Sequence, residues 1–354
     1  MPLRFFFLLP ALFFFTQVLA VALPKPFLFN GQSVAPGRKV ATLLYVTAGQ
    51  DTAVVPVTVF HGHRPGPVLG IIAGVHGYEY PPILAAQQLA QELDPAQLRG
   101  TVILVHLANV PGFLGRRIQV NPQDEKNLNR VFPGKADGTI TERLAWRLGN
   151  DVMARCTHVI DVHAGDALDD LRPYAGYYNY FDTPALSETG RQMATALGFP
   201  YVVQFGNEAS LQDQAAMYCS REAIKRGIPA VDIECGRFGL PEVDAVAQIK
   251  QALYRLLGHL DIIGDKPLAT TPLLIAQRTT VTSSHTGFFY PQVKAGELIH
   301  KGRKLGYLTD LFGTPVADVV APVDGVVLYM TATPPISKGE SLLNIGHVPL
   351  TTRL

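Results

Sequence analysis

Cysteine and charge are both scarce in this chain of 354 residues. Only Cys156, Cys219 and Cys235 occur, an odd number without close pairs, so at most one disulfide could form and a disulfide-stapled fold is excluded. Charged residues make up 17%, and 30 basic residues against 29 acidic ones leave a net charge of +1. The sequence therefore carries no electrostatic footprint for nucleic acid, and any charged substrate must be bound locally.

Apolar residues are abundant by contrast, at 47% of the chain, which excludes a disordered protein. The 32 glycines and 27 prolines indicate many turns between strands. No repeat or low-complexity tract is present. The length favours two domains or one large domain.

The first 22 residues have the composition of a secretory signal peptide. A single charge at Arg4 precedes an apolar run from Phe5 to Phe15, and small residues follow at Ala20 and Ala22. The run is about half of the roughly 20 residues that a membrane-spanning helix needs, so we expect no stable membrane span after cleavage. The prediction is a periplasmic or secreted protein, with an uncleaved anchor as the alternative.

Residues 23–265 alternate between strand and helix patterns. We expect strands within residues 39–60, most clearly at 53–60, and over residues 68–73, 101–107, 158–163, 201–205 and 230–234. Helices are expected over residues 81–93, 141–154, 184–197, 211–225 and 241–257. Short apolar runs in such alternation are typical of an α/β fold, in which helices flank both faces of a mainly parallel sheet.

Residues 266–354 lose the helical periodicity and contain short strands rich in Val, Ile and Gly. Their pattern is similar to the barrel-sandwich modules of biotinyl and lipoyl carriers, but no Lys stands beside Met at the expected hairpin tip. We therefore predict a small all-β domain that acts as a structural lid or an oligomer surface, rather than as a swinging arm.

Metal-type ligands follow two of the buried strands. His76 and Glu79 come directly after the strand at 68–73, and His163 ends the strand at 158–163. The His-x-x-Glu spacing alone is weak, because a surface ion pair has the same spacing. Open α/β sheets, however, bind their ligands at the carboxyl ends of the strands, where His163 would face the same cleft. Two His and one Glu with a vacant fourth position form a ligand set of hydrolytic zinc.

A further acid stands on the strand expected at 230–234. Alternation places Asp232 and Glu234 on one face of this strand, with Glu234 nearer the carboxyl end. Glu234 is therefore the candidate group for moving a proton during hydrolysis. Its neighbour Cys235 is expected to be a buried apolar residue rather than a nucleophile.

Four ordered segments resemble the succinylglutamate desuccinylase and aspartoacylase family, which has the zinc carboxypeptidase fold. They are GVHGYEYPP, KNLNRVFPG, DVHAGD and DIECG, and the resemblance spans residues 62–257. It implies a mixed, mainly parallel sheet, one zinc ion on His76, Glu79 and His163, and Glu234 as the general base that then acts as an acid. The C-terminal β module is similar to the family's second domain.

The resemblance also implies substrate-binding groups. Asn129 and Arg130 match the family's pair that binds the substrate carboxylate, and an upstream Arg would polarise the scissile carbonyl. Arg116 and Arg117 both qualify for that role, with Arg117 preferred. Asp161 would orient His163 from behind, unless it is simply solvated.

The expected activity is zinc-dependent removal of an acyl group from N-acyl amino acids or related small amides. An exported zinc carboxypeptidase or murein-peptide amidase is the alternative enzyme, because an exported chain also meets peptides. A non-catalytic binding protein would show a broken ligand or base, and His76, Glu79, His163 and Glu234 are all present. The expected partner is a small-molecule substrate, and assembly into a homo-oligomer is left open.

Overall fold

The computed structural model describes residues 24–206, 210–213 and 215–349, so the expected signal peptide lies outside the described residues. Its largest element is a nine-stranded sheet in the order β14-β12-β11-β13-β9-β5-β6-β4-β3. The strands are β3 (Arg38–Ala48), β4 (Asp51–His61), β5 (Arg64–Ala73), β6 (Arg99–Val105), β9 (His158–His163), β11 (Tyr174–Tyr178), β12 (Tyr201–Phe205), β13 (Ala230–Glu234) and β14 (Leu273–Ile275).

The sheet is mixed and mainly parallel, as the family resemblance implies. The central strands β13, β9, β5 and β6 run parallel, whereas β3, β4 and β6 pair antiparallel and β11 is antiparallel to β13. The parallel strands β6 and β9 are almost entirely buried and β5 is buried over its second half, which explains their continuous apolar sequences. Their carboxyl ends meet at one edge of the sheet.

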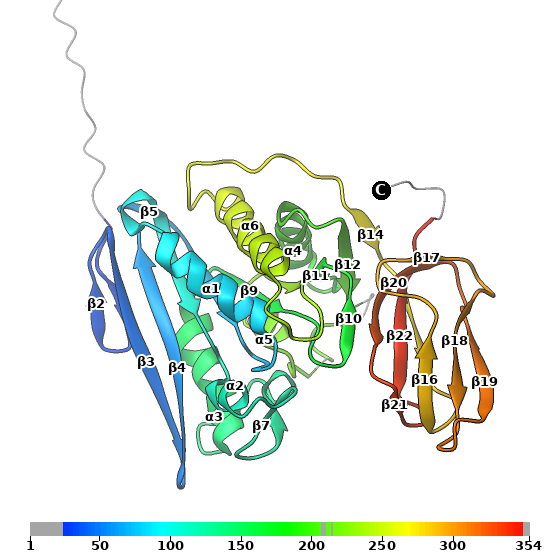
Figure 1. Ribbon diagram of the computed structural model, residues 1–354. Coiled ribbons are helices and arrows are strands. Elements are labelled where there is room, and N and C mark those ends of the chain that lie inside the picture. The colour runs from blue at the N-terminus through cyan, green and yellow to red at the C-terminus, as the bar shows by residue number, and fades with distance from the viewer. Residues whose placement is uncertain (1–23, 207–209, 214, 350–354) are drawn as a thin grey trace, which may run out of the picture.

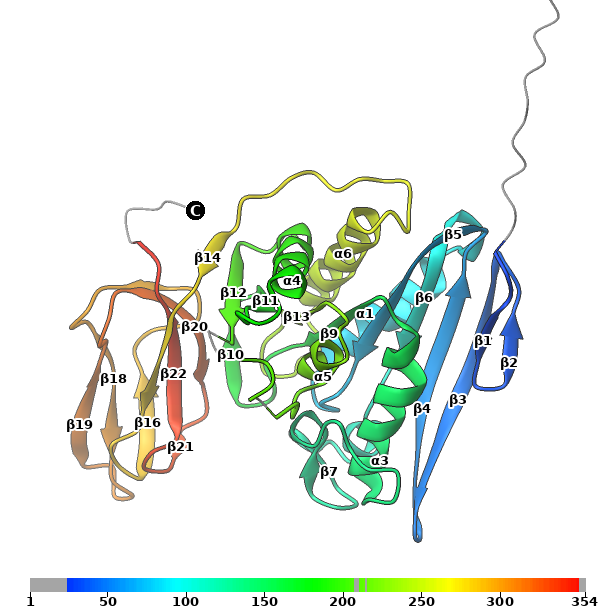
Figure 2. The ribbon, with the colours of Figure 1, turned by 180° about the vertical axis from the view of Figure 1, so that it is seen from behind.

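Helices cover both faces of this sheet (Figures 1 and 2). On one face, α1 (Tyr80–Glu92), α4 (Pro184–Ala196) and α6 (Val243–His259) bury Leu89, Met193 and Leu253 against the strands. On the other face, α3 (Ile140–Arg147) and α5 (Cys219–Lys225) bury Leu144 and Ala223. The short elements are α2 (Val110–Leu114), β1 (Phe27–Phe29), β2 (Gln32–Val34), β7 (Val120–Asn121), β8 (Lys126–Asn127) and the 3-10 turns Pro95–Gln97, Leu128–Arg130 and Met153–Arg155.

Two expected helices are shorter than the sequence suggests. The helix expected at 211–225 is formed only by α5, because the backbone of Met217 adopts a positive φ of 54° and pairs with Phe132. The helix expected at 141–154 is α3 followed by a π turn at Leu148–Val152 and a 3-10 turn. No helix within the described ranges combines the length and apolar character that crossing a bilayer requires.

The C-terminal part is β-rich, as expected, and consists of two stacked sheets. Its strands are β15 (Arg278–Thr282), β16 (Gly287–Pro291), β17 (Leu298–Ile299), β18 (Lys304–Thr309), β19 (Pro315–Val320), β20 (Gly325–Thr331), β21 (Pro335–Ile336) and β22 (Ser341–Gly346). One sheet has the order β10-β20-β22-β15, with β17 also on β20, and the other has the order β19-β18-β16-β21. Side chains such as Phe289, Leu305 and Leu343 fill the core between them.

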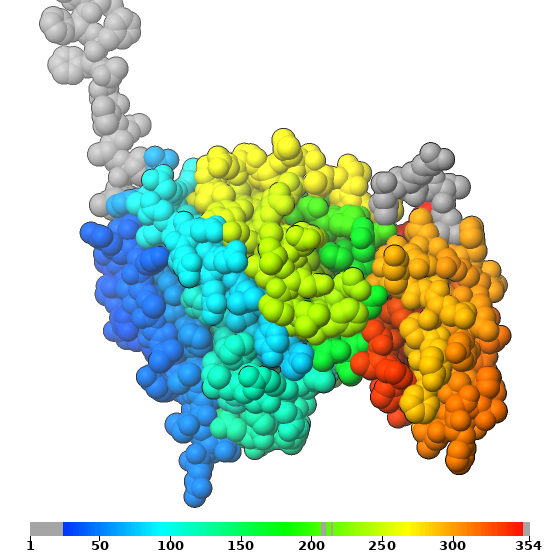
Figure 3. Space-filling model, in the orientation of Figure 1, coloured from blue at the N-terminus to red at the C-terminus, as the bar shows by residue number. Residues whose placement is uncertain are grey.

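Each of the two parts of the chain adds a short strand to a sheet of the other part. The short strand β10 (Asp169–Leu171) pairs with β20 of the C-terminal part, and β14 adds to the nine-stranded sheet beside β12. Figure 3 shows the orange and red C-terminal part seated against the green segments at one end of the molecule. The expected boundary between residues 265 and 266 stays a prediction, but these two pairings connect the two parts of the chain.

Candidate active site

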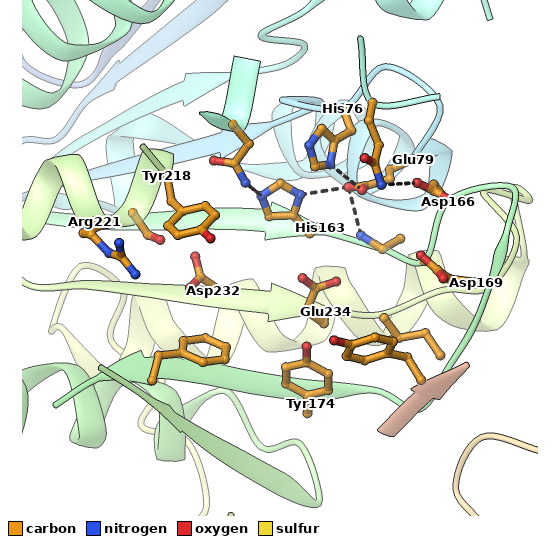
Figure 4. A pocket seen from close by; sticks show the side chains of 18 of the residues that line it. His76, Glu79, His163, Asp166, Asp169, Tyr174, Tyr218, Arg221, Asp232 and Glu234 are labelled. Atoms are coloured by element: carbon orange, nitrogen blue, oxygen red, sulfur yellow. Dashed lines mark hydrogen bonds and ion pairs between the residues drawn. The ribbon is translucent and has the colours of Figure 1, made fainter. Parts of the chain in front are cut away.

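A cavity of about 480 Å³ opens at the carboxyl ends of the parallel strands. It collects residues that are far apart in the sequence, and Figure 4 shows them facing one another across it. The lining includes six residues singled out from the sequence: His76, Glu79, Asn129, Arg130, His163 and Glu234. The cavity therefore unites the four motifs in one place.

The turn after β5 presents His76 and Glu79. The strand ends at Ala73, Gly74 turns the backbone with a φ of 69°, and Glu79 is the residue that precedes the first turn of α1. Gly77 packs so closely that an added Cβ would lie 2.1 Å from the backbone nitrogen of Phe113. Only glycine fits there, which explains the glycine between the two predicted ligands.

The three predicted metal ligands converge. Nδ1 of His76 lies 2.7 Å from Oε1 of Glu79, and Nδ1 of His163 lies 2.9 Å from Oε2 of the same carboxylate. One ligand atom from each residue lies within 4.8 Å of the others, and all three side chains are buried. The imidazole rings are 5.0 Å apart between centroids.

The outer nitrogens of both imidazoles face acceptor oxygens. Nε2 of His76 lies 3.2 Å from Oδ1 of Asn127, and Nε2 of His163 lies 2.9 Å from Oδ2 of Asp161. A proton on each Nε2 leaves the lone pair of each Nδ1 pointing at the Glu79 carboxylate. Buried lone pairs from two nitrogens and a carboxylate then need a cation between them, and this donor set fits Zn²⁺.

Electrostatics hold Glu79 as a carboxylate. Burial raises its pKa, but the two imidazoles beside it lower the pKa to about 2. The pKa of His163 is affected in the opposite sense: burial lowers it, yet Asp161 and Glu79 together raise it well above the ordinary value. Negative charge therefore surrounds the imidazoles, as expected for a pocket that accepts a divalent cation.

Glu234 lies at the end of β13 and faces the same cavity. The parallel register of β9 and β13 places it directly opposite His163. Burial raises the pKa of Glu234 well above its ordinary value; the positive charge of His163 opposes this, while Glu79, Asp232 and Asp169 reinforce it. A raised carboxyl pKa next to a candidate metal suits a group that takes up and returns a proton.

Asn129 and Arg130 come from the 3-10 turn that follows β8. Nδ2 of Asn129 lies 3.3 Å from Nε2 of His163, and its Oδ1 accepts a hydrogen bond from the backbone of Cys219. The guanidinium of Arg130 lies over the ring of Tyr218 at 4.8 Å. Both predicted substrate-binding residues therefore border the cavity.

The structure does not bring Arg117 to the cavity. Its guanidinium is half-exposed and bonded to Glu125 at 2.5 Å, and its neighbour Arg116 lines a separate surface hollow. Gln119 enters the cavity wall instead and donates a hydrogen bond to Asp166. The role of Arg117 in polarising a carbonyl stays a prediction.

Several lining residues lie outside the sequence motifs. Tyr218 and Arg221 line one side of the cavity, beside Asp232 of the DIECG motif, and Arg278 and Tyr329 reach it from the C-terminal part. The alternation of β13 did point to Asp232, but only as a neighbour of Glu234. Nothing in the sequence pattern signals Arg278 or Tyr329, because their position depends on how the two parts of the chain pack.

All three cysteines are free and buried. Burial raises the pKa of Cys235 to about 12, so its thiol stays protonated. Cys235 is therefore a packing residue, as expected, and not a nucleophile.

The comparisons with known proteins agree with this geometry. Residues 65–260 match the model of the succinylglutamate desuccinylase/aspartoacylase catalytic domain. The N-alpha-acetyl-L-2,4-diaminobutyric acid deacetylase of Halomonas elongata is 27% identical over 301 residues, which cover 83% of this chain and 86% of that protein.

Solved structures share the fold over most of their length. The product-bound ectoine utilization protein EutE (DoeB) of Ruegeria pomeroyi is 25% identical with a TM-score of 0.79, over 88% of this chain and 95% of that one. A succinylglutamate desuccinylase/aspartoacylase of Rhodobacter sphaeroides is 23% identical with a TM-score of 0.78, over 87% and 95% respectively. With its catalytic-domain match covering more than half of its length, the chain belongs to the succinylglutamate desuccinylase/aspartoacylase family.

Proposed function

We propose that this protein is a zinc-dependent hydrolase that removes the acyl group from N-acyl amino acids. The observation that carries the proposal is the convergence of His76, Glu79 and His163, with Glu234 opposite His163, in one cavity bordered by guanidinium groups. The similarity to a deacetylase of an N-acetyl amino acid supports the same reaction class.

His76, Glu79 and His163 would hold the zinc ion. When bound, zinc lowers the pKa of a water molecule and polarises a carbonyl group. The protein's own contribution is to fix the ligands: Asn127 and Asp161 orient the imidazoles, and the backbone of Ala164 donates a hydrogen bond to Glu79.

Glu234 would move the proton. Its carboxylate accepts a proton from the attacking water, whose oxygen bonds to the carbonyl carbon. The carbon–nitrogen bond then breaks, and Glu234 returns the proton to the departing amine. The products are a carboxylic acid and a free amino acid.

Arg130 and Arg221 would bind the substrate carboxylate. Both guanidiniums lie against Tyr218, at 4.8 and 4.6 Å from its ring, and both line the cavity. A guanidinium binds a carboxylate through two parallel hydrogen bonds, which fixes the orientation of the bound molecule.

Hydrolysis assays test this function directly. The zinc-loaded protein is incubated with N-acetyl and N-succinyl amino acids and with short D,L-peptides, and free amine is quantified. We expect turnover of the N-acyl amino acids, its loss on chelation and its return with zinc. If only the peptides were hydrolysed, the deacylase proposal would be wrong, and the exported carboxypeptidase or murein-peptide amidase would take its place as the proposed activity.

We also propose that the chain is exported and processed near residue 22. The single basic residue, short apolar run and small residues of this segment support export. Expression of the full-length chain followed by fractionation and N-terminal sequencing tests it. A cytoplasmic protein that retains its first residues would contradict it.

A further inference from the structure

Asp232 is a buried carboxylate in the cavity that the proposed reaction does not use. The residue is 7% exposed and lines the cavity. Because it stands two residues before Glu234 on β13, both carboxylates face the same side of the sheet. Figure 4 shows Asp232 between Glu234 and Arg221.

Within the described part of the chain, no cationic side chain forms an ion pair with Asp232. Its neighbours on the adjacent strands are Asp161 on β9 and Gly176 on β11, and the ring of Phe205 covers Gly176. The carboxylate of Asp161 already faces His163 at 2.9 Å. Neither of these two neighbouring residues therefore supplies a cation, and the charge of His163 on β9 acts on Asp232 without an ion pair.

The helix above Asp232 supplies only partial compensation. The hydroxyl of Ser220 donates a hydrogen bond to the hydroxyl of Tyr178 at 3.3 Å, and the charge of Arg221 acts on Asp232 without an ion pair. The guanidinium of Arg221 instead stacks on the rings of Tyr178 and Tyr218, at 5.5 and 4.6 Å. A buried carboxylate without a paired cation is unfavourable, so a cationic group of a ligand would be bound strongly there.

The groups around Asp232 define the shape of that ligand. Arg130 and Arg221 stand on the same side of the cavity, where they suit a carboxylate, and Asp232 adds one negative charge beside them. Residues two apart on a strand are separated by roughly 7 Å, which is the spacing of Asp232 from Glu234. A ligand ammonium bound to Asp232 would therefore be separated by only a few carbon atoms from the amine that Glu234 protonates.

We infer that Asp232 selects Nα-acyl amino acids whose short side chain ends in an ammonium group. The inference rests on the proposed deacylase function and narrows its substrate class. The α-carboxylate binds the arginines, the scissile amide lies beside Glu234, and the side-chain ammonium binds Asp232. Asp232 is then a specificity residue that touches the substrate without entering the chemistry.

The test compares two substrates of nearly equal shape, Nα-acetyl-L-2,4-diaminobutyrate and N-acetyl-L-norvaline. For the wild type we expect kcat/KM to be about 10- to 100-fold higher for the cationic substrate, as expected for one charged hydrogen bond. In Asp232→Asn the preference should fall below about threefold, through a higher KM for the cationic substrate, with the norvaline substrate little affected.

Asp169→Asn is the matched control, because Asp169 lines the other side of the same cavity. It should keep the preference. Equal rates on both substrates in the wild type, an unchanged preference in Asp232→Asn, or an equal loss of preference in both variants would overturn the inference.

A binding measurement separates this inference from the proposed function. Calorimetry with the products L-2,4-diaminobutyrate and L-norvaline needs no turnover. We expect the wild type to bind the diamino acid more tightly and Asp232→Asn to bind the two alike. Equal binding by the wild type would refute the role of Asp232, whereas selective binding without hydrolysis of either substrate would refute only the deacylase proposal.

Discussion

His163 and Glu234 are direct neighbours across the parallel strands β9 and β13. This one pair of facing residues therefore contains both a candidate zinc ligand and the candidate base. Because strand register is fixed by the buried apolar residues on either side, the distance between the two groups is set by the core and not by a mobile loop. Hydrolysis requires such precise placement, because the attacking water must lie within reach of both the metal site and the base.

Replacement of Glu234 by Gln should abolish the reaction without removing the metal. Glutamine keeps the size of the side chain but cannot accept a proton, so we expect kcat to fall by about 10²- to 10⁴-fold. The measurement is kcat together with zinc content by elemental analysis. A variant that retained kcat within a few-fold, with zinc bound, would show that another group moves the proton.

The pH dependence of the reaction should report the raised pKa of Glu234. The base works as a carboxylate, and its pKa in the folded protein is well above the ordinary 4.5, mainly through burial. Activity should therefore be lost as the pH falls through this raised pKa, at a higher pH than an unperturbed carboxyl would give. The measurement is kcat/KM as a function of pH.

Replacing Asp169 by Asn tests the direction in which this pH profile shifts. The negative charge of Asp169 raises the pKa of Glu234, so its removal should lower that pKa. The fall of kcat/KM on the acidic side of the profile, the acid limb, should then move to lower pH. Asp318→Asn, at a surface ion pair with Lys304, should leave the limb in place. An acid limb that stays fixed in Asp169→Asn would mean that Glu234 does not control it.

Gly77→Ala should disturb the metal-binding turn. The added Cβ would lie 2.1 Å from the backbone nitrogen of Phe113, so the turn that carries His76 and Glu79 must shift. We expect a loss of roughly 1–3 kcal/mol in the free energy of unfolding and weaker zinc binding. Urea unfolding and zinc titration measure these effects.

Gly264→Ala is the control for this substitution. An added Cβ at Gly264 meets no atom within 4 Å, so both quantities should stay close to those of the wild type. Equal behaviour of the two variants would contradict the packing argument.

Local sequence predicted the elements that carry the site because their signals are local. The apolar run of β5 ends in the glycines that shape the turn at His76, and the alternation of β13 places Glu234 and Asp232 on one face. The family resemblance added Asn129 and Arg130, which do line the cavity. These features depend on a few adjacent residues, so a single sequence contains them.

Features that depend on long-range packing were not predictable in the same way. Met217 leaves the expected helix because its backbone pairs with Phe132, 85 residues earlier by their numbers. Arg278 and Tyr329 reach the cavity because β10 pairs with β20 and β14 pairs with β12. Such contacts join segments more than 70 residues apart by their numbers, and no periodicity in either segment encodes them.

Arg130 and Arg117 should differ strongly when each is replaced by Ala. Arg130 lines the cavity, so its loss should raise KM by about 10- to 100-fold, as expected for a charged hydrogen bond to a carboxylate. Arg117 is half-exposed and paired with Glu125, and such surface pairs contribute about 0–1 kcal/mol. We expect Arg117→Ala to change the turnover rate by less than about threefold.

Steady-state kinetics on the zinc-loaded variants decide this comparison. If Arg117→Ala slowed turnover by about 100-fold or more, equivalent to about 2.7 kcal/mol, the arginine would have to leave Glu125 and act at the scissile carbonyl. The role that the family resemblance implies for Arg117 would then be correct, although this structure places its guanidinium outside the cavity.

Zinc content is the measurement that tests the central claim most directly. The wild type, reconstituted with zinc and freed of excess metal, should hold about one ion per chain. His76→Ala and His163→Ala should each remain folded by circular dichroism and hold less than about a tenth of that amount, because two of three ligands cannot close the site. A wild type that binds no zinc, or histidine variants that bind as much as the wild type, would contradict the assignment of His76, Glu79 and His163 as one metal centre.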